Sequence, residues 1–381
     1  TAGCRLVCYA PAPMLPADTF ISEPPKELVL RDGFRFRHGQ VIAPFTIVYE
    51  TFGTLNADRS NAILVCHALS ASAHAAGKYG DNDDEKPGWW DGLVGYGKAI
   101  DLEQYFVVCV NLPGSPFGTT APKSIDSASG MAYGSRYPWP TIEDMVESQK
   151  IVLDHLGITH VRAIAGGSLG GMQVLMWAAM YPEFSDSIIA MASGPAVPVT
   201  GIAWHILGRK IIESDQRFRG GDYYDDPESL RGLQVARMLG HMTYLSQEAL
   251  QRKFGRRRRG ATRQFEIDSY FEYQGKKFAM LYDANSYIRV QAAMDEMDLD
   301  EQYGDLLSAF GRWRGRTLIV SFDTDWLFPP AESERVASAM RELGTPVVHH
   351  EIASANGHDT FLIDFELIEE LVRSFLTNDE R

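Results

Sequence analysis

Apolar residues in the first half of the chain form short, nearly unbroken runs separated by more polar stretches. Four runs rich in β-branched residues occupy residues 61–69, 105–112, 160–167 and 187–194. Continuous apolar runs of this length are typical of parallel strands covered on both faces. The pattern therefore predicts a parallel sheet with helices on each side.

A helix is predicted between the second and third of these runs. Residues 141–157 read TIEDMVESQKIVLDHLG, with apolar residues at helical spacing. Thr141 and Asp144 are placed for a capping box, and Gly157 would end the helix. With its neighbouring strands, this segment predicts a β-α-β unit.

The second half of the chain changes its pattern and then returns to it. Residues 196–304 form polar, amphipathic helical stretches, whereas residues 316–325 and 346–354 resume strand character. The simplest architecture is an α/β sheet interrupted by a helical insertion. We expect a core domain of residues 1–195 and 305–381 and a helical lid domain of residues 196–304.

Composition narrows the class of protein. The 381 residues include 45% hydrophobic residues, enough for a sizeable core, and carry a net charge of −14. A nucleic acid or an anionic membrane would need a basic surface, so neither is expected as a partner. One basic run, RKFGRRRRG, contains Arg256–Arg259. We interpret this run as a solvated loop, with a phosphate or CoA contact as the alternative.

The cysteines and the first residues of the sequence bear on the cellular location of the protein. The four cysteines show no metal-ligand spacing, so we expect buried thiols in a reducing cytoplasm and no bound metal; they are Cys4, Cys8, Cys66 and Cys109. No apolar stretch reaches membrane-spanning length, and the start lacks the pattern of a signal peptide. A cytoplasmic location is predicted.

The segment AIAGGSLGGMQ places a serine among four glycines, between a strand-like run and a helix-like run. Gly166, Ser168 and Gly170 fit G-x-S-x-G, the turn that exposes a nucleophilic serine above the sheet of an α/β-hydrolase. Small residues allow the strained backbone and close chain approach of such a turn. The alternative is a glycine-rich turn without catalytic function.

A nucleophilic serine needs a base and an orienting carboxylate, which follow it in this fold in the order Asp or Glu, then His. Asp325 ends one late strand-like run, and His358 follows the last one. Order and position therefore support a Ser168–His358–Asp325 triad. The competing residues are Asp323, His349 and His350.

Backbone N–H groups should stabilise the oxyanion of an acyl-transfer reaction. The N–H of Leu169, directly after the serine, is the first candidate, and Leu69 in the turn VCHALSASAH is the second. His67 and His74 lie in the same segment, but no carboxylate or cysteine set accompanies them as metal ligands. We interpret His67 as a residue that shapes the loop.

Eight segments together resemble the homoserine O-acetyltransferase family of the α/β-hydrolase superfamily: HALSASAHAAG, WWDGLVGYGKAID, FGTTAPKSID, GGSLGGMQ, GGDYY, DANSYI, TDWLFPP and GHDTFL. The similarity extends from about Phe45 to Leu376. The resemblance implies an α/β-hydrolase fold, with a mostly parallel central sheet and a helical lid insertion. It also implies acyl transfer from acyl-CoA to an amino-acid hydroxyl through an acyl-serine, in homodimers formed through the lid.

The resemblance assigns roles to individual residues. Ser168 matches the family nucleophile, Asp325 the triad acid and His358 the base. Arg209 matches the lid arginine that holds the substrate carboxylate, and Asp359 matches the carboxylate that holds the substrate ammonium. Two opposite charges would orient a zwitterionic amino acid with its hydroxyl toward the acyl-serine.

Leu327 bears on which acyl group, acetyl or succinyl, the protein transfers. Succinyl-transferring members of the family resemble DWRF where this chain reads DWLF, so the arginine that would pair with a succinyl carboxylate is absent here. We therefore expect the transferred acyl group to be acetyl. The segments AWHILGR and PGSPFGT depart from the family pattern at the pocket walls, which leaves homoserine or serine open as the acceptor.

The sequence thus predicts an acetyl-CoA:L-homoserine O-acetyltransferase with a two-step mechanism, which would feed methionine synthesis. Acetyl-CoA is the expected co-substrate, without a metal or redox cofactor. The alternatives are a serine O-acetyltransferase, a homoserine O-succinyltransferase, a carboxylesterase-type hydrolase and a non-catalytic binding protein on the same scaffold.

Overall fold

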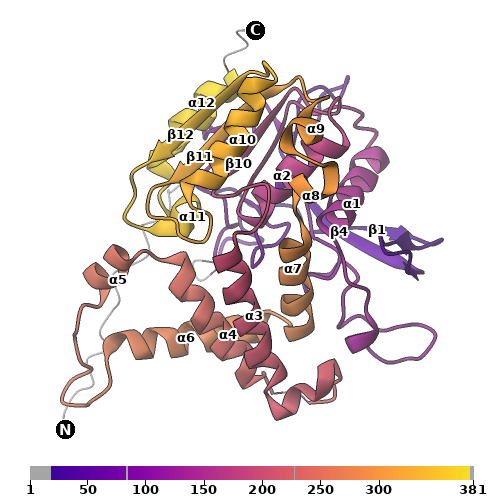
Figure 1. Ribbon diagram of the computed structural model, residues 1–381. Helices are drawn as coiled ribbons and strands as arrows, with labels where there is room; N and C mark the ends of the chain where they lie inside the picture. The colour runs from indigo at the N-terminus through magenta and orange to yellow at the C-terminus, as the bar shows by residue number, and fades with distance from the viewer. Residues whose placement is uncertain (1–18, 83–84, 227, 378–381) are drawn as a thin grey trace.

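An eight-stranded sheet forms the centre of the computed structural model, which describes residues 19–82, 85–226 and 228–377 (Figure 1). In spatial order the strands are β1 (Lys26–Leu30), β4 (Phe45–Phe52), β8 (Phe106–Val110), β5 (Ala62–Cys66), β9 (Ala163–Gly167), β10 (Ser187–Met191), β11 (Arg316–Phe322) and β12 (Val347–Ile352). The six strands from β8 to β12 are parallel, and β1 and β4 pair antiparallel at one edge. The predicted α/β fold with a mostly parallel sheet is confirmed.

Successive residues of the central strands point to opposite faces of the sheet, and both faces are buried. Leu64 and Ile164 belong to one core cluster, whereas Ile63 and Ala163 belong to the other. The first cluster is covered by α1 (Ile142–His155), α2 (Leu169–Met180) and α10 (Pro330–Glu342), and the second by α12 (Glu369–Thr377). Burial on both faces explains why these strands are almost entirely apolar.

The predicted helix between β8 and β9 is α1. Thr141 and Asp144 form the capping box, because each side chain accepts a hydrogen bond from the backbone N–H of the other residue. Leu156 caps the carboxyl end, and Gly157 follows with a φ of +70°. Both predicted ends of this helix are confirmed.

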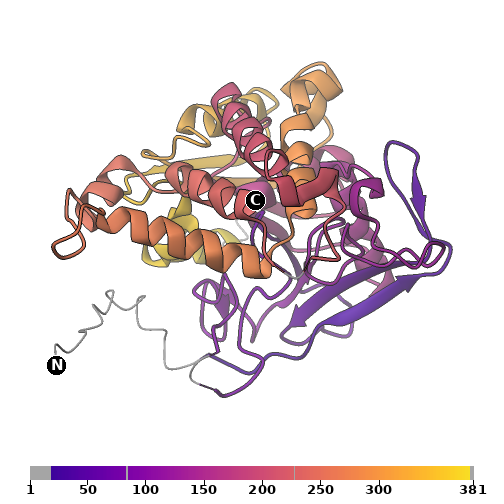
Figure 2. The same cartoon turned by 90° about the horizontal axis from the view of Figure 1, so that it is seen from below.

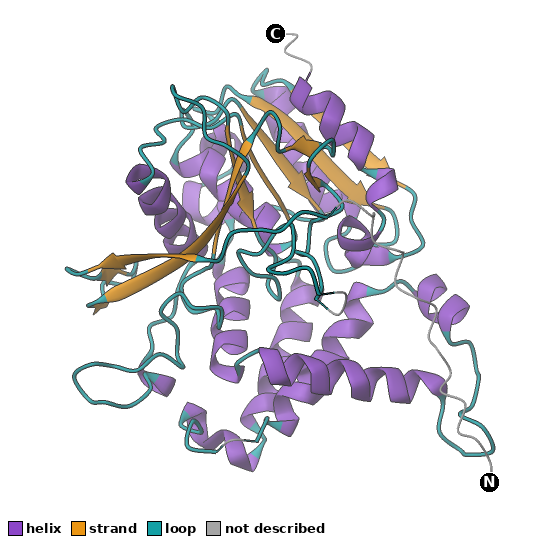
Figure 3. Cartoon of the chain, turned by 180° about the vertical axis from the view of Figure 1, so that it is seen from behind, coloured by secondary structure: helices purple, strands orange, loops and turns teal. Residues whose placement is uncertain are grey.

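The described part of residues 196–304 contains six α-helices, the first five of which gather beyond one end of the sheet (Figures 1 and 3). They are α3 (Val199–Glu213), α4 (Arg231–Tyr244), α5 (Gln247–Lys253), α6 (Glu266–Leu281), α7 (Ala284–Glu296) and α8 (Leu299–Tyr303). Figure 2 shows α6 extending away from the body, with α5 and the connecting loop at its outer end. We call α3–α7 the lid.

The remaining α-helices and strands of the described residues are short. They are α9 (Leu306–Phe310), α11 (Thr360–Ile363) and two small sheets, β2 (Phe34–Arg35) with β3 (Val41–Ile42) and β6 (Val94–Gly95) with β7 (Ile100–Asp101). Cys66 and Cys109 are buried free thiols, whereas Cys4 and Cys8 lie outside the described residues. Of the helices in the described ranges, none has the length and apolar character needed to cross a membrane.

Candidate active site

Ser168 occupies the sharp turn between β9 and α2. Its backbone lies at φ +57° and ψ −126°, a strained conformation for a residue with a side chain. The flanking glycines are required by close packing, since a Cβ on Gly170 would lie 2.1 Å from the carbonyl oxygen of Cys66. A Cβ on Gly166 would lie 2.6 Å from the carbonyl carbon of Gly170. The turn therefore has the strand–serine–helix geometry predicted from the glycine spacing.

Ser168, His358 and Asp325 form a continuous chain of hydrogen bonds. The Ser168 hydroxyl lies 2.8 Å from Nε2 of His358, and Nδ1 of His358 lies 2.7 Å from Oδ2 of Asp325. The other carboxylate oxygen of Asp325 accepts hydrogen bonds of 2.9 Å from the N–H groups of Leu327 and Phe328. Asp325 is thus fixed in place and favours the tautomer in which Nδ1 carries the proton and Nε2 can accept one.

The competing carboxylate, Asp323, has a different function. Its side chain accepts a hydrogen bond of 2.9 Å from the N–H of Ser354, which ties the end of β11 to the loop after β12. The competing His349 lies within β12, bonded to Ser321 and Glu334, and His350 lies in the same strand. The structure therefore brings together the three residues chosen from the sequence.

His358 is buried, yet its pKa lies above the ordinary value for histidine. Burial alone would lower the pKa, but the charge and hydrogen bond of Asp325 raise it more, with a further contribution from Asp359. A base of this kind is stabilised when it takes up a proton. This is the property that proton transfer from Ser168 requires.

The two predicted oxyanion residues both lie beside Ser168. Leu169 is the first residue of α2, so its N–H has no partner within the helix. Leu69 follows β5 and lines the same cavity as Ser168. Its carbonyl accepts a hydrogen bond of 2.8 Å from the Tyr282 hydroxyl, and the Gln173 amide donates to the carbonyls of His67 and Leu169. These contacts hold the loop after β5 against the start of α2.

His67 and His74 do not form a metal site. Nδ1 of His67 lies 2.8 Å from the carbonyl of Ala68, and burial lowers the pKa of His67 to about 4. His74 pairs instead with Glu50 at 3.0 Å. Within the described ranges, no three His, Cys, Asp or Glu side chains are grouped as metal ligands.

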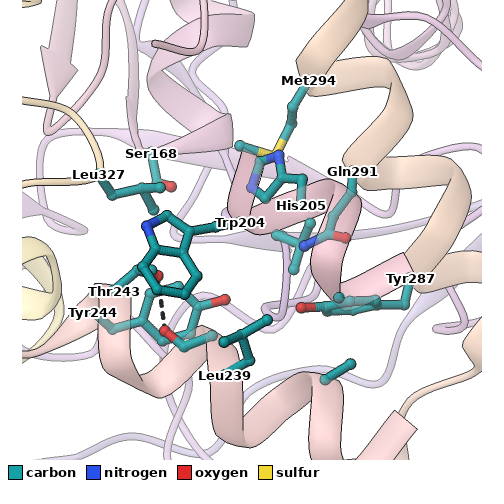
Figure 4. Close-up of a pocket in the computed structure, with 14 residues that line it drawn as sticks. Ser168, Trp204, His205, Leu239, Thr243, Tyr244, Tyr287, Gln291, Met294 and Leu327 are labelled. Atoms are coloured by element: carbon teal, nitrogen blue, oxygen red, sulfur yellow. Dashed lines mark hydrogen bonds between the residues drawn. The ribbon is translucent and has the colours of Figure 1, made fainter. Parts of the chain in front are cut away.

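The lid covers the serine (Figure 4). Ser168 and Leu327 lie on one side of a cavity whose other walls come from α3, α4 and α7. The labelled lid residues are Trp204, His205, Leu239, Thr243, Tyr244, Tyr287, Gln291 and Met294. Leu327 is only 4% exposed, and its side chain faces the space beside the serine.

Arg209, which the family resemblance assigns to the substrate carboxylate, is engaged in an ion pair within the lid. Arg209 lies on α3, and its Nη1 is 2.6 Å from Oδ2 of Asp295 on α7. Arg209 does not line the space at Ser168, although His205 and Gly208 from the same helix do; Arg237 and Asp359 also lie outside this lining, so the ion pair is what distinguishes Arg209. This ion pair links two lid helices behind the cavity wall.

Asp359 directly follows His358 and is partly buried. Burial raises the pKa of its carboxyl to about 6, against the opposing effect of the His358 and Arg237 charges. Asp359 is therefore mostly ionised near neutral pH, and it directly follows the base in the chain.

Arg237 is a cation near Asp359 that the sequence analysis missed. It lies on α4, with its guanidinium carbon 4.5 Å from the Phe278 ring centroid and 5.1 Å from that of Tyr244. Its Nε and Nη1 atoms are buried without a hydrogen-bond partner among the described residues. Buried donors of this kind require an acceptor, which a bound carboxylate would supply.

The parallel sheet, the serine turn and the order Ser, Asp, His define an α/β-hydrolase with a helical lid. A family model described as the alpha/beta hydrolase fold matches residues 61–365. The chain is 42% identical over 360 residues to the homoserine O-acetyltransferase of Deferribacter desulfuricans, covering 92% of this chain and 95% of that one. It is 44% identical over 364 residues to the homoserine O-succinyltransferase of Burkholderia ambifaria, with the same coverage.

Solved structures of α/β-hydrolase fold enzymes are also similar to this chain. The homoserine O-acetyltransferase from Bacillus anthracis matches with a TM-score of 0.87 and 30% identity, covering 94% of this chain and 98% of that one. Esterase E22 matches with a TM-score of 0.85 and 26% identity, covering 93% and 99%. The chain belongs to the homoserine O-acyltransferase family of the α/β-hydrolases.

Proposed function

We propose that the protein transfers an acetyl group from acetyl-CoA to the hydroxyl of L-homoserine. The observation that supports this most strongly is the Ser168–His358–Asp325 chain under a lid, with Asp359 and the unpaired Arg237 beside it. The triad supplies acyl-transfer chemistry. The two opposite charges supply a reason for the acceptor to be an amino acid rather than water.

In the first half-reaction, His358 accepts the proton of Ser168 as the serine oxygen attacks the thioester carbonyl. The resulting oxyanion would be stabilised by the N–H groups of Leu169 and Leu69. The carbon–sulfur bond then breaks, and His358 returns the proton to the departing thiolate as CoA-SH leaves. Ser168 now carries the acetyl ester.

In the second half-reaction, the amino acid takes the place of CoA. Asp359 would bind its ammonium and Arg237 its carboxylate, so that the hydroxyl points toward the ester carbonyl. His358 removes the hydroxyl proton, the new ester bond forms and the bond to Ser168 Oγ breaks. The proton then returns to the serine, which restores the starting enzyme.

Leu327 favours acetyl over succinyl in this proposal. Its buried apolar side chain adjoins Ser168, and it offers no charge to pair with the carboxylate at the end of a succinyl chain. The relatives include both acetyltransferases and succinyltransferases, so the acyl group depends on this local argument.

A product assay tests the proposal. Purified protein is offered acetyl-CoA or succinyl-CoA with homoserine or serine, and the esters are identified by mass. We expect O-acetylhomoserine with the highest kcat/KM, and we expect Leu327→Arg to shift the preference toward succinyl-CoA. A higher kcat/KM for succinyl-CoA in the wild type would overturn the acetyl assignment.

Hydrolysis is the second candidate function, because esterase E22 shares the fold at 26% identity. The same assay separates the two functions when free acetate is measured beside the ester. If homoserine leaves the rate of CoA release unchanged and all of the acetyl group appears as acetate, the protein is an esterase.

A further inference from the structure

Four cationic side chains come from three lid helices and from a loop of the core domain. Arg237 comes from α4, Lys253 from the end of α5, Lys277 from α6 and Lys86 from the loop before Trp89. The Lys253 ammonium lies 4.3 Å from the Tyr270 ring centroid, and that ring lies 5.7 Å from the ring of His241. The Arg237 guanidinium lies against Phe278, the residue after Lys277.

The charges of these groups affect one another and the buried His241. Burial lowers the pKa of His241 to about 2, and the charges of Arg237, Lys253 and Lys277 add to the effect. The pKa of Lys277 is also lowered, first by loss of solvent and then by Lys86 and Arg237. Like charges therefore act on one another around His241.

These cations lack acidic partners. None of the four forms an ion pair with a carboxylate in the part of the chain that the structure describes, although the chain has 50 Asp and Glu residues and a net charge of −14. His241 is only 5% exposed, and neither of its buried ring nitrogens has a hydrogen-bond partner among the described residues. Unpaired cations beside unsatisfied buried nitrogens form a site suited to an anion.

A surface pocket is lined by residues of the loop after Leu69 and of α6, including Phe278, against which Arg237 lies. The pocket has a volume of about 250 Å³. One wall is Ser70–Ser72, directly after Leu69, and the facing walls are Pro87–Trp89 and Phe278. Pro87 and Phe278 directly follow Lys86 and Lys277 in the chain, and Leu69, which directly precedes Ser70, lines the cavity at Ser168.

We propose that Lys86, Lys253 and Lys277 bind the phosphate groups of the acyl-CoA donor, while its pantetheine arm lies along this pocket. The inference rests on the proposed function, because it takes acyl-CoA as the donor. The diphosphate and 3′-phosphate of CoA carry several negative charges, which a protein of net charge −14 would otherwise repel. Lysine ammonium groups are suitable point-charge partners for phosphate.

Paired donors test this proposal. We compare acetyl-CoA with acetyl-pantetheine, which has the same thioester but no phosphate, in the wild type and in Lys253→Gln/Lys277→Gln. We expect the variant to raise the KM for acetyl-CoA roughly tenfold and to leave that for acetyl-pantetheine nearly unchanged. The matched control is Lys276→Gln, an exposed neighbour on α6 whose charge acts on Glu272, and it should change neither value.

Two outcomes overturn the phosphate site: an unchanged KM for acetyl-CoA, or equal increases for both donors. The variant Lys253→Arg/Lys277→Arg keeps the charges and should retain the wild-type KM even if the glutamine variant folds poorly; a loss with arginine would also contradict the proposal. If the wild type depends on these lysines for acetyl-CoA but makes no acylhomoserine, the phosphate site stands and the acceptor assignment fails. If neither donor acylates Ser168, both proposals fail.

Discussion

Asp325 contacts His358 through one carboxylate oxygen and the backbone through the other, so replacing it should disturb the base and little else. We expect Asp325→Asn to lower kcat on the order of 10⁴-fold, because the amide would favour the wrong tautomer of His358. Asp323→Asn is the matched control and should keep kcat within about threefold, since the Asp323 side chain accepts a hydrogen bond from Ser354 in the loop after β12 rather than from the base.

The pH profile of kcat/KM distinguishes loss of the base from loss of the fold. Neutral His358 is the active form, so activity falls as the pH drops through its pKa, which Asp325 raises. Residual activity of Asp325→Asn should therefore persist to lower pH than that of the wild type. If Asp323→Asn causes the large loss and Asp325→Asn does not, the triad acid has been assigned to the wrong aspartate.

We expect opposite effects on the KM for homoserine when the two lid arginines are replaced. Arg237→Ala should raise the KM for homoserine at least about tenfold with a smaller effect on acetyl-CoA, because the charge that would bind the acceptor carboxylate is lost. Arg209→Ala should leave both KM values nearly unchanged, since Arg209 is paired with Asp295 away from the cavity. Steady-state kinetics with each substrate varied in turn measure both, and the reverse result would restore Arg209 as the carboxylate ligand.

The difference between these arginines shows what the sequence could predict at single residues. Ser168, Asp325 and His358 follow the carboxyl ends of strands. In a parallel sheet these ends lie at the same edge, independently of how the lid helices pack. The position of an arginine on a lid helix depends on which helix face packs toward the core. Arg237, His241 and Tyr244 share one face of α4 by helical spacing, but only the packing of α4 against α6 shows where that face points.

At the scale of elements, the turn between β9 and α2 depends on close backbone contact. Gly170→Ala should lower the free energy of unfolding by about 1–3 kcal/mol or more, because its Cβ would overlap the Cys66 carbonyl. Gly208→Ala, in the middle of α3, is the control. No atom lies closer than 3.9 Å to its added Cβ, so we expect stabilisation by about 0.5–1 kcal/mol.

Urea unfolding of the two glycine variants measures these changes. A stability of Gly170→Ala equal to that of the wild type would mean that the strand and helix can separate at this turn without cost. The close approach would then not be the reason for glycine at this position.

The sequence predicts some elements better than others. The apolar runs of β5, β8, β9 and β10 predict strands because strands buried on both faces are continuously apolar. The sequence does not predict the antiparallel edge, since β4 reads FTIVYETF and mixes polar with apolar residues, although most of it is buried. Its Glu50 is buried beside His74 and Tyr79, a tertiary arrangement that the local pattern does not show.

At the scale of the whole molecule, we propose that α3 of the lid joins two copies of the chain. Ile206 and Leu207 on this helix are 44% and 51% exposed, and Val199 at its start is 82% exposed. Apolar side chains grouped in this way are typical of contact surfaces. Light scattering should give the mass of a dimer for the wild type and of a monomer for Leu207→Glu.

The control for this prediction is Met131→Glu, which places the same charge on an exposed methionine of the core domain. This variant should remain dimeric. A monomeric wild type at micromolar concentration, or a Leu207→Glu variant that stays dimeric, would contradict the proposed interface.

The central claim is that Ser168 carries the acyl group between donor and acceptor, and intact-protein mass spectrometry tests it most directly. Wild-type protein mixed with acetyl-CoA should gain the mass of one acetyl group, mapped to Ser168, and should lose it with formation of O-acetylhomoserine when homoserine is added. Ser168→Ala should gain no acetyl group. If Ser168→Ala is still acetylated and still transfers the group to homoserine, the account is contradicted.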